Sequence, residues 1–553
     1  MRLNQIGFYP DGQKLAVVLS DTATDFYITA ADSNTKLYSG KLIDLRNNIY
    51  SKQLTRIADF TSFAMEGIFI LHASGAGSSY PFEIKKQVHY EVTKAAIKSF
   101  YYQRFSIPLT EKYAGKWARP ASSSHKKVIV HASAATASRP AGSVISSTRG
   151  WIDAGDYNKY IVNSGITTST LLSAYEDFPN YFSSLNLNIP ESSNKLPDIL
   201  DEVLWNLRWM MTMQDPKDGG VYHKCTNAKF DGMIMQNKGI TPRYVVMKST
   251  AAALNFAAVT AQASRVFRNF SKQLPGLADS CLNMSRKAYQ WAVKNPRVIY
   301  DQDKMNKLFN PDITTGAYGD GDVSDEFAWA AAELYTVTAD NNLLKNITTE
   351  REDDNPIPSW NQTRLLAYYT LVRHAKPNAE NELLIQTLKG RIVGAAESLV
   401  RNISYQAYHT VMGTTPKDFE WGSNAVAANQ GILLLQAFHL TNDKKYLDNA
   451  LSNLDYLLGR NATGYSFLTG HGDKTPMHIH HRPSEADGIV EPVPGLLAGG
   501  PNPGMQDKCT TYPSTVPDEA YTDDVCSYAS NEVAINWNAP FVYLSAAIEF
   551  FYR

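Results

Sequence analysis

Residues 425 to 438 read Ala-Val-Ala-Ala-Asn-Gln-Gly-Ile-Leu-Leu-Leu-Gln-Ala-Phe, and this stretch decides the class of fold. Small and apolar side chains would cover nearly every face of a helix with this sequence. Such a helix must be buried among other helices, which predicts a large helical structure. Residues 328–335, Ala-Trp-Ala-Ala-Ala-Glu-Leu-Tyr, have the same character, whereas residues 380–402 carry a polar face that is typical of an outer helix.

Helical periodicity extends on both sides of these stretches, from about residue 93 to the C-terminus. Alternation of inner and outer helices favours an all-α toroid of six helical hairpins, written (α/α)6. An irregular helical domain or a solenoid is the alternative, but the helices share no fixed sequence period, which argues against a solenoid. The twelve expected helices, one of them short, are Thr93–Phe105, Thr167–Phe178, Pro197–Met213, Ser249–Phe267, Pro275–Val293, Asp325–Thr338, Asn341–Asn346, Thr363–His374, Glu380–Asn402, Ser423–Leu440, Lys444–Leu458 and Asn538–Tyr552.

The first 88 residues have a different pattern. Short β-rich runs such as Leu15–Leu19, Phe26–Thr29 and Gly67–Leu71 are separated by Asp, Gly, Ser and Asn. This spacing predicts a small all-β sandwich, so the chain is multidomain, with a β module at 1–88 and a helical domain at 89–553. The connection lacks a Gly/Ser-rich or Pro-rich linker, so we expect the module to pack on the helical domain.

Composition excludes several classes of protein. The chain has 553 residues, 44% hydrophobic and 19% charged, with a formal net charge of −1. The apolar fraction is too high for a disordered chain. The balanced charge argues against a nucleic-acid binder or a polybasic membrane-surface protein. The sequence has no run of 18 apolar residues, so we expect no membrane-spanning helix. We expect a monomer.

The N-terminus lacks the apolar stretch of a signal peptide, because Met1-Arg-Leu3 leads directly into Asn4-Gln-Ile-Gly7. The protein is therefore cytoplasmic or periplasmic, or it is secreted and its signal lies outside this sequence. We expect the secreted form.

The four cysteines are Cys225, Cys281, Cys509 and Cys526, and none forms a CxxC pair. Cys509 and Cys526 flank a loop of 16 residues that a disulfide could close. Free buried thiols are the alternative.

Three long segments with little periodicity, residues 107–166, 296–324 and 460–537, are rich in Asp, His, Gly, Pro and Trp. Loops of this length in a compact domain are usually functional. If the helices form a rigid frame, we expect these loops to build a cleft at one end of it.

The first loop contains Gly150-Trp-Ile-Asp-Ala-Gly-Asp-Tyr-Asn-Lys-Tyr160, with Asp153 and Asp156 three residues apart on a Gly-containing turn. At this spacing one carboxylate could take a proton from a water molecule while the other holds the same water. An Asx-rich turn or a calcium loop is the alternative interpretation.

The third loop contains a His-rich stretch, Ser466 to Ser484, in which four His and one Arg fall between residues 471 and 482. Such tracts suggest metal binding, but no cysteine lies nearby and HExxH does not occur. Arg482 and the imidazoles could instead hydrogen-bond to sugar hydroxyls. A surface loop with incidental histidines is the alternative.

Glu532 lies further along the same loop, in the nearly uncharged stretch from Val525 to Phe550. Apolar surroundings raise the pKa of a carboxyl group, which can then stay protonated and act as a general acid. The contrast with the polar Asp153/Asp156 turn is the acid–base pattern of glycosidic cleavage. A helix-capping or ion-paired glutamate is the alternative.

Together these three motifs resemble glycoside hydrolase family 9, a family of cellulases, and they occur in that family's order. Gly150–Tyr160 is similar to its DAGD motif, and Ile479-His-His-Arg482 is similar to the end of its first signature. Asn4-Gln-Ile-Gly-Phe8 and the β-rich first 88 residues resemble the immunoglobulin-like module that precedes many of its catalytic domains. The second signature is matched by Tyr521, Asp523, Tyr528, Glu532 and Asn538-Ala539.

The resemblance implies an (α/α)6 toroid and an inverting endo-β-1,4-glucanase that hydrolyses cellulose or a related β-glucan. It implies that Asp156 is the catalytic base, Asp153 its water-holding partner and Glu532 the general acid. Inversion predicts that the base and the acid lie about 6.5–9.5 Å apart. The remaining implied site residues are His480 and Asp523 in support of catalysis, and Arg482, Trp421 and Tyr528 as substrate-binding residues.

Two rival functions remain open. One is an exo-acting β-glucosaminidase or cellobiohydrolase on the same scaffold. The other is a catalytically inactive carbohydrate-binding protein, against which the presence of Asp153, Asp156 and Glu532 argues.

No cofactor is expected for the chemistry itself. The segment Gly319–Glu326 resembles a calcium loop of the family at Asp325 and Glu326, and with Asp322 it offers the oxygen ligands that Ca²⁺ prefers; helix capping by Ser324 is the alternative. Some relatives bind structural zinc near the DAGD motif. Here His125 and His131 are present but position 147 is Ser rather than Cys, so we expect the zinc site to be weak or absent.

Overall fold

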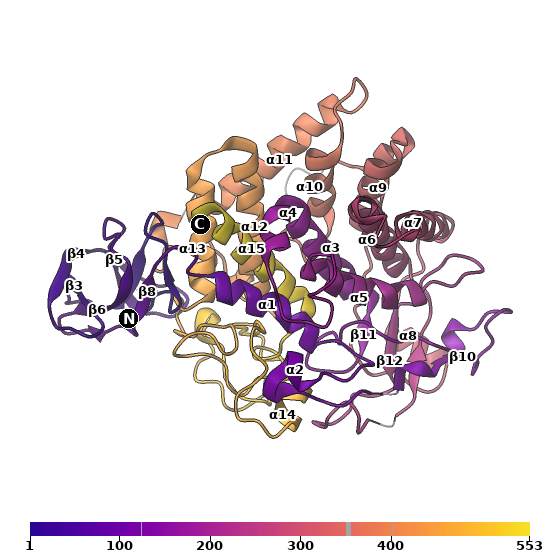
Figure 1. Ribbon diagram of the computed structural model, residues 1–553, viewed down its shortest axis with the longest axis horizontal. Coiled ribbons are helices and arrows are strands. Elements are labelled where there is room, and N and C mark those ends of the chain that lie inside the picture. The colour runs from indigo at the N-terminus through magenta and orange to yellow at the C-terminus, as the bar shows by residue number, and fades with distance from the viewer. Residues whose placement is uncertain (123, 240, 350–355, 402) are drawn as a thin grey trace. The chain divides into compact units, whose positions relative to one another are not determined.

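The computed structural model describes residues 1–122, 124–239, 241–349, 356–401 and 403–553 (Figure 1). The chain divides into two compact units, and each is discontinuous in sequence. The first unit comprises Met1–Ser99, Val393–His480 and Val490–Arg553. The second comprises Phe100–Ile392 and His481–Ile489. None of the described helices is long and apolar enough to cross a membrane.

The first unit begins with a β module whose strands are β1 (Gly7–Phe8), β2 (Leu15–Leu19), β3 (Asp25–Ala30), β4 (Lys36–Asn47), β5 (Leu54–Asp59), β6 (Gly67–Ala73), β7 (Gly77–Ser78) and β8 (Phe82–Ile84). They are ordered β1-β8-β6-β3-β4-β5-β2, with β7 on β6. The long strand β4 pairs first with β3 and then with β5, and its register shifts after Ile43. The chain can thereby fold into two layers.

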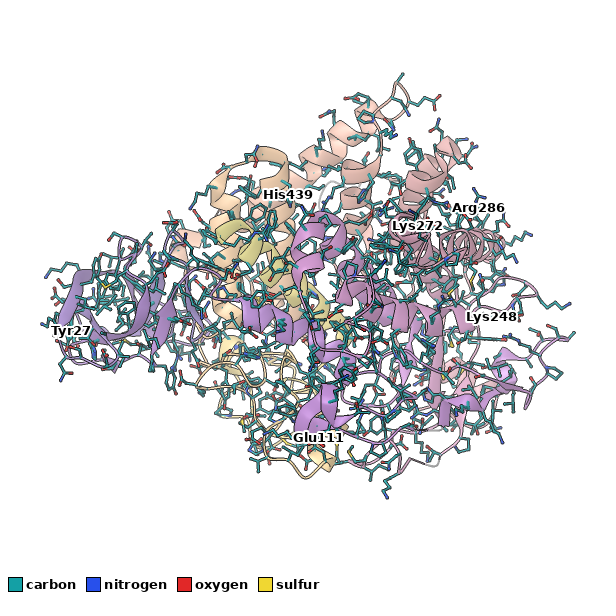
Figure 2. The ribbon with its side chains drawn as sticks, viewed as in Figure 1. Tyr27, Glu111, Lys248, Lys272, Arg286 and His439 are labelled. Atoms are coloured by element: carbon teal, nitrogen blue, oxygen red, sulfur yellow. A yellow bond between two sulfur atoms is a disulfide. The ribbon has the colours of Figure 1, made fainter. Side chains whose placement is uncertain are left out.

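The core of the module lies between these layers. Ile28 of β3 and Leu71 of β6 are register partners, and both belong to one buried cluster with Val18 of β2. Tyr27, labelled in Figure 2, alternates with these positions and stacks on His72, so it lies on the other face of its strand. The β-rich module predicted from the first 88 residues is confirmed.

The module is joined to helices of the first unit by a buried polar network. Asn4 Nδ2 donates to Asp455 Oδ1 (2.9 Å) and contacts His89 Nε2 (3.0 Å). The Tyr9 hydroxyl donates to Glu549 Oε2 (2.6 Å), and burial lowers the pKa of His89 to about 3. Buried polar groups must be hydrogen-bonded, so this network fixes the module in place. The expectation that the module packs on helices is confirmed.

The helices of the first unit surround one that is buried almost all round, α12 (Ser423–Thr441). This helix packs against α13 (Lys444–Leu457) and α15 (Ile535–Tyr552). A Cβ atom at Gly431 of α12 would lie 2.7 Å from a methyl group of Leu544 of α15, so the glycine lets the two helices approach closely without moving that side chain. The burial predicted for residues 425–438 is confirmed.

The second unit contains two further helices with buried surfaces nearly all round, α3 (Ile161–Asp177) and α6 (Thr250–Phe267), which pack against each other. Amphipathic helices cover them: α5 (Asp198–Thr212) packs on α3, and α7 (Leu277–Lys294) packs on α6. Inner and outer helices therefore alternate along this part of the chain, as the sequence predicts. The next two helices in contact are α9 (Ser324–Thr338), which also packs on α6, and α10 (Arg364–His374).

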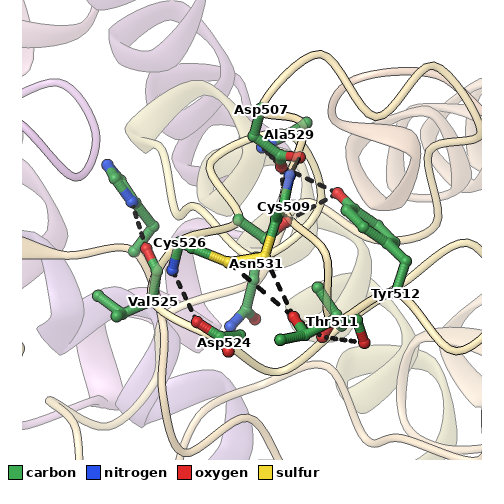
Figure 3. Close-up of a disulfide and its surroundings, with 12 residues drawn as sticks. Asp507, Cys509, Thr511, Tyr512, Asp524, Val525, Cys526, Ala529 and Asn531 are labelled. Atoms are coloured by element: carbon green, nitrogen blue, oxygen red, sulfur yellow. Dashed lines mark hydrogen bonds between the residues drawn. A yellow bond between two sulfur atoms is a disulfide. The ribbon is translucent and has the colours of Figure 1, made fainter.

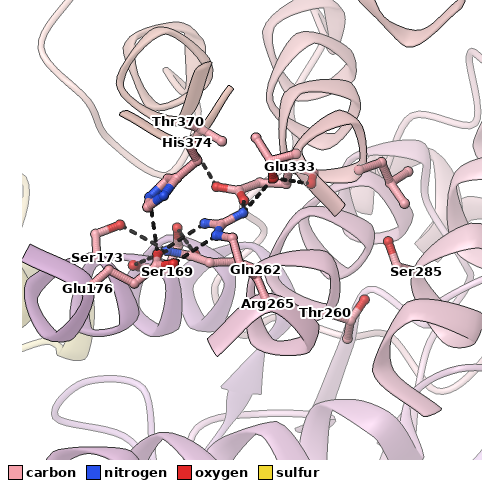
Figure 4. Close-up of polar contacts among 12 residues, drawn as sticks. Ser169, Ser173, Glu176, Thr260, Gln262, Arg265, Ser285, Glu333, Thr370 and His374 are labelled. Atoms are coloured by element: carbon pink, nitrogen blue, oxygen red, sulfur yellow. Dashed lines mark hydrogen bonds and ion pairs between the residues drawn. The ribbon is translucent and has the colours of Figure 1, made fainter. Parts of the chain in front are cut away.

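A buried ion-pair network links these inner helices (Figure 4). Arg265 of α6 donates to Glu176 of α3 (2.7 Å) and to Glu333 of α9 (2.7 Å). Thr370 of α10 donates to Glu333 (2.6 Å), and burial lowers the pKa of the neighbouring His374 to about 4. Breaking a pair of this kind is costly, because it leaves a buried charge without its partner.

The long segments that the sequence leaves without periodicity contain short elements. A five-stranded sheet of the second unit has the order β10-β9-β13-β12-β11. Residues 341–346, expected as a short helix, form a 3₁₀ turn, and residue 402, the end of an expected helix, lies outside the described residues. The other elements are β9 (Val128–Val130), β10 (Val144–Ile145), β11 (Lys159–Tyr160), β12 (Lys224–Asn227), β13 (Arg243–Val245), α1 (Tyr90–Tyr102), α2 (Glu111–Ala114), α4 (Pro179–Ser184), α8 (Gln302–Leu308), α11 (Glu382–Val400) and α14 (Arg482–Ala486).

Candidate active site

The DAGD segment, residues 150–160, is built into the second unit by its backbone. Gly150 has φ +80°, and a Cβ atom there would lie 2.8 Å from Trp209, so no other residue fits. The Gly150 carbonyl accepts hydrogen bonds from Phe105 N (2.9 Å) and Trp205 Nε1 (3.2 Å). The segment ends in strand β11, which leads directly into the buried helix α3. Its two aspartates therefore start from a fixed backbone.

Asp153 is buried and accepts three hydrogen bonds. Asn163 Nδ2 lies 3.0 Å from both of its carboxylate oxygens, and the Tyr318 hydroxyl donates to Oδ2 (3.2 Å). Burial raises the pKa of Asp153 well above its usual range, and the negative charge of Asp156 adds to this effect. The two carboxylates are thus close enough to interact directly.

Asp156 has one occupied and one open carboxylate oxygen. Asn158 Nδ2 and the Tyr160 hydroxyl (3.0 Å) both donate to Oδ2. The other oxygen, Oδ1, is buried and has no hydrogen-bond partner among the described residues. A buried carboxylate oxygen left without a partner costs free energy and calls for an explanation such as a bound water or a catalytic role.

Two buried cations lie around Asp156. Lys224 donates to the Gly316 carbonyl (2.6 Å), and Arg243 donates to the Tyr157 carbonyl (2.6 Å). Burial lowers the pKa of each, and the negative charge of Asp156 opposes that decrease in both. Arg243 therefore holds the residue that follows Asp156, whereas Lys224 holds the distant loop at Gly316.

Arg482 ties a distant segment to this motif. Its backbone N–H (3.1 Å) and Nη1 (2.8 Å) donate to the Gly155 carbonyl, and Nε donates to the Asp231 carbonyl (2.9 Å). The side chain is 7% exposed. The structure therefore uses the predicted substrate-binding arginine to position the residue next to Asp156.

The first unit holds the other predicted residues. His480 and Glu532 form a short parallel bridge, in which His480 N donates to the Asn531 carbonyl (3.0 Å). Glu532 is also held through its own carbonyl, which accepts from Gly499 N (2.8 Å). His480 Nδ1 lies 2.6 Å from the Val525 carbonyl, which can only accept, so Nδ1 carries the proton. This contact fixes the tautomer and the orientation of the His480 ring.

Asp523 joins the two signature segments. Its carboxylate accepts hydrogen bonds from Met477 N (2.8 Å), His478 N (2.9 Å) and Asn531 Nδ2 (3.1 Å). These contacts fix the backbone on both sides of the bridge between His480 and Glu532.

A disulfide between Cys509 and Cys526 closes the loop that precedes Glu532 (Figure 3). Cys526 directly follows Val525, the residue whose carbonyl accepts the hydrogen bond from His480 Nδ1, so the disulfide restrains that contact. Of the two alternatives that the sequence left open, the structure has the disulfide for Cys509 and Cys526, and free buried thiols for Cys225 and Cys281.

The family of this chain follows from its similarity to known proteins. Residues 90–545 match the model of glycosyl hydrolase family 9. The chain belongs to this family. Residues 1–78 match the cellulase N-terminal Ig-like domain, which is the β module described above.

The chain resembles characterised members of family 9 over nearly its full length. It is 44% identical over 551 residues to a xyloglucan-specific endo-β-1,4-glucanase of Bacteroides ovatus, covering 99% of this chain and 93% of that protein. It is 32% identical over 552 residues to endoglucanase D of Acetivibrio thermocellus, covering 99% and 83%. The solved structure of a Bacteroides ovatus GH9 protein matches with a TM-score of 0.94 at 42% identity, covering 100% of this chain and 99% of that one.

In this family 9 protein the predicted aromatic platform lies in the first unit. Trp421 is 44% exposed, and its ring centroid lies 5.4 Å from that of Tyr528. The ring of His480 lies 5.9 Å from Tyr528 on the same unit. An exposed indole beside a tyrosine suits a sugar, since a pyranose has an apolar face that stacks on flat rings.

The predicted calcium ligands form an acidic group at the start of α9. Both oxygens of Glu326 are buried without a hydrogen-bond partner among the described residues, and burial, with Asp325 and Asp320 nearby, raises the pKa of Glu326 well above its usual range. Asp325 Oδ2 accepts from Thr363 N (2.6 Å). The oxygen donors suit Ca²⁺. In the described parts of the chain, however, Asp322, Asp325 and Glu326 do not meet within 4.8 Å, so binding would require them to move closer together.

The two histidines considered as zinc ligands, His125 and His131, have different surroundings. His125 is buried and stacks on Phe105, with ring centroids 3.9 Å apart. Both ring nitrogens of His131 have partners, Ser133 Oγ (2.8 Å) and the Pro311 carbonyl (3.1 Å). Ser147 Oγ contacts Thr212 Oγ1 (2.8 Å). A weak or absent zinc site stays a prediction.

Sequence reasoning missed the residues that hold the aspartates. Tyr160 ends the motif and Asn163 follows it by three residues, so their spacing offered a signal. Tyr318 comes from a loop 165 residues after Asp153 and offered none. The signature Asn538 also has a structural use, because it accepts from Leu497 N (2.8 Å) and fixes the loop to α15.

Proposed function

We propose that this family 9 glycosyl hydrolase is an inverting endo-β-1,4-glucanase in which Asp156 is the catalytic base. The observation that carries the proposal is the buried Oδ1 of Asp156, which has no hydrogen-bond partner in the described chain while Oδ2 has two. A base needs such an open oxygen to receive a proton from water. Asp153 lies beside it and can hold the same water.

The chemistry proceeds in one displacement. The water oxygen bonds to the anomeric carbon from the face opposite the leaving group, and its proton passes to Asp156. The glycosidic bond breaks, and Glu532 transfers its proton to the departing oxygen. His480 and Asp523 position the segment that carries Glu532, since both hydrogen-bond to the backbone or side chains beside it.

The substrate is a β-1,4-glucan. Trp421 and Tyr528 stack on its sugars, and Arg482 fixes the DAGD segment. The similarity to a xyloglucan-specific enzyme supports xyloglucan, a β-1,4-glucan with side branches, as the favoured member of this class. An exo-acting enzyme on the same scaffold is the second candidate.

The test is a product analysis with the full-length protein. Xyloglucan, carboxymethyl cellulose, barley β-glucan, xylan and chitosan are incubated with wild-type protein and with Asp156→Asn. We expect a rapid fall in the viscosity of a β-1,4-glucan, which marks internal cleavage, and products that first appear as the α-anomer by NMR. Slow viscosity loss with one small product would indicate exo action, and an initial β-anomer would refute inversion.

Three further proposals accompany this function. The alternation of inner and outer helices supports an (α/α)6 arrangement of the helical domain, with residue 88 near its boundary. The orphaned carboxylate of Glu326 supports a structural Ca²⁺ held with Asp325 and Asp322, which a rise in melting temperature on adding Ca²⁺ would test. A secreted monomer suits a polymeric substrate that cannot enter cells.

A further inference from the structure

Phe230 is an exposed aromatic residue to which the proposed mechanism gives no role. It lies on the loop between β12 and β13 of the second unit, and 48% of its surface is exposed. Single exposed apolar residues are common on proteins, so exposure alone carries no argument. A role for Phe230 is indicated instead by the position of its ring.

The ring of Phe230 is placed against the DAGD segment by Arg482. The guanidinium carbon of Arg482 lies 5.7 Å from the centroid of the Phe230 ring, within the range of a cation–π contact. The same guanidinium donates to the carbonyl of Gly155, the residue before Asp156, and to the carbonyl of Asp231, the residue after Phe230. A fixed cation therefore covers one face of the ring and connects it to the catalytic segment.

The loop that carries Phe230 is anchored on both sides. The Asp231 carboxylate accepts from Asn227 Nδ2 (3.0 Å) and from Thr241 Oγ1 (3.1 Å). The Tyr157 hydroxyl, which belongs to the DAGD segment, donates to the Ile234 carbonyl (2.8 Å). A ring that is held in this way loses little conformational freedom when a ligand binds, which favours affinity.

We infer that Phe230 is a stacking platform for one glucosyl unit of the substrate and thereby a residue that contributes to the affinity for long oligosaccharides. The inference rests on the proposed function, since it assumes a β-1,4-glucan beside Asp156. The equatorial hydroxyls of β-glucose leave two C–H faces that are apolar enough to lie on a flat ring. A phenyl ring offers no hydrogen-bonding edge, so it binds the face of the sugar without selecting its hydroxyl pattern. Such a platform tolerates branches on the glucan.

The experiment measures hydrolysis and binding separately. Hydrolysis is followed for Phe230→Ala, Phe230→Trp and the control Ile234→Ala, an exposed apolar residue of the same loop, on linear β-1,4-gluco-oligosaccharides of increasing length and on xyloglucan oligosaccharides. Binding of the same oligosaccharides is measured by calorimetry in the Asp156→Asn background. Melting temperatures are recorded for all variants.

For Phe230→Ala we expect KM and Kd to rise about 10-fold, the effect of losing one well-packed aromatic contact. The rise should appear only for oligosaccharides long enough to reach the platform. Phe230→Trp should restore affinity, and Ile234→Ala should match the wild type. Unchanged Kd in Phe230→Ala, or equal losses for every length together with a lower melting temperature that Trp does not restore, would overturn the inference.

The outcome separates this inference from the proposed function. If wild-type protein binds the oligosaccharides but cleaves none of them, while Phe230→Ala weakens binding, the platform stands and the proposed activity fails. If wild-type protein cleaves them and Phe230→Ala behaves like wild type, the activity stands and the platform fails. If no oligosaccharide binds, both are overturned.

Discussion

The DAGD segment and the segment around Glu532 each hold a carboxyl group in place, but they do so through different contacts. Asp153 and Asp156 are 1% and 4% exposed and lie on a turn that precedes strand β11 and the buried helix α3. Glu532 is half-buried and lies in the segment that leads into α15, held by Asp523, Asn531 and a disulfide. Side-chain hydrogen bonds hold the carboxylates of Asp153 and Asp156 directly, whereas a backbone bridge and a nearby disulfide hold the segment that carries Glu532. We therefore expect the two segments to respond differently to the same kind of damage.

The largest expected effect separates the two carboxyl groups by kinetics. Asp156→Asn removes activation of water, so cleavage of glucan and of an aryl glycoside with an acidic phenol should both fall by roughly 10²–10⁴-fold. Glu532→Gln should reduce glucan cleavage by a similar factor but the aryl glycoside much less, because an acidic phenol leaves without a proton. The measurement is the ratio of the two rates in each folded variant. The reverse pattern would exchange the two assignments.

The second effect concerns the pKa of Asp153 in the DAGD segment. The Tyr318 hydroxyl donates to Asp153 and so favours its ionised form. Tyr318→Phe should raise the pKa of Asp153 further, which moves the acid limb of the kcat/KM profile to higher pH and lowers activity about 10-fold on that limb. Tyr368→Phe, whose hydroxyl bonds to the Thr348 carbonyl, serves as the control. An unshifted acid limb would separate Asp153 from the pH dependence.

A third effect concerns the covalent link near Glu532. Cys509→Ser, Cys526→Ser and the double variant should each lose about 3 kcal/mol of stability, since each opens the same loop. The double variant should match the single ones, because the two sulfurs act as one unit. Activity on glucan should fall several-fold as the Val525 contact to His480 loosens. Additive losses in thermal unfolding, or losses absent from all three, would contradict this restraint.

The smallest effect tests the pH response of the same loop. Burial raises the pKa of Asp518 from 3.8 to about 7, against the hydrogen bond from Asn48. In the window between these values the unfolded chain releases this proton first, so stability falls as pH rises and the loss is complete above about pH 7. Asp518→Asn should raise the melting temperature by a few degrees at pH 8 and hardly at pH 4. The exposed Asp473→Asn is the control, and a gain of equal size at both pH values would contradict the mechanism.

The sequence predicted those features that depend on residues close together in the chain. The all-round apolar stretch at residues 425–438 becomes a buried helix, because no arrangement leaves that surface in water. The spacing of Asp153 and Asp156 predicted that they act together, whereas the flanks of the 16-residue loop only allowed a disulfide between Cys509 and Cys526, which the structure contains. The contacts that complete the site come from distant segments, such as Tyr318 on Asp153, and a single sequence holds no periodicity that could reveal them.

Arg482 shows a second limit of prediction. Its residue type predicted contact with sugar, yet its guanidinium is occupied by two backbone carbonyls. A donor group suits a carbonyl and a hydroxyl equally well, so the choice between them depends on the fold and not on the sequence around the residue.

The Asn4 network also constrains how the protein is made. Asn4 and Tyr9 are translated hundreds of residues before their buried partners Asp455 and Glu549. The β module can form its own core early. The face that carries Asn4 and Tyr9, however, stays exposed to water until α15 has been synthesised. A chain that stops before residue 549 would leave that face exposed, so incomplete translation products should be the species that chaperones and proteases meet.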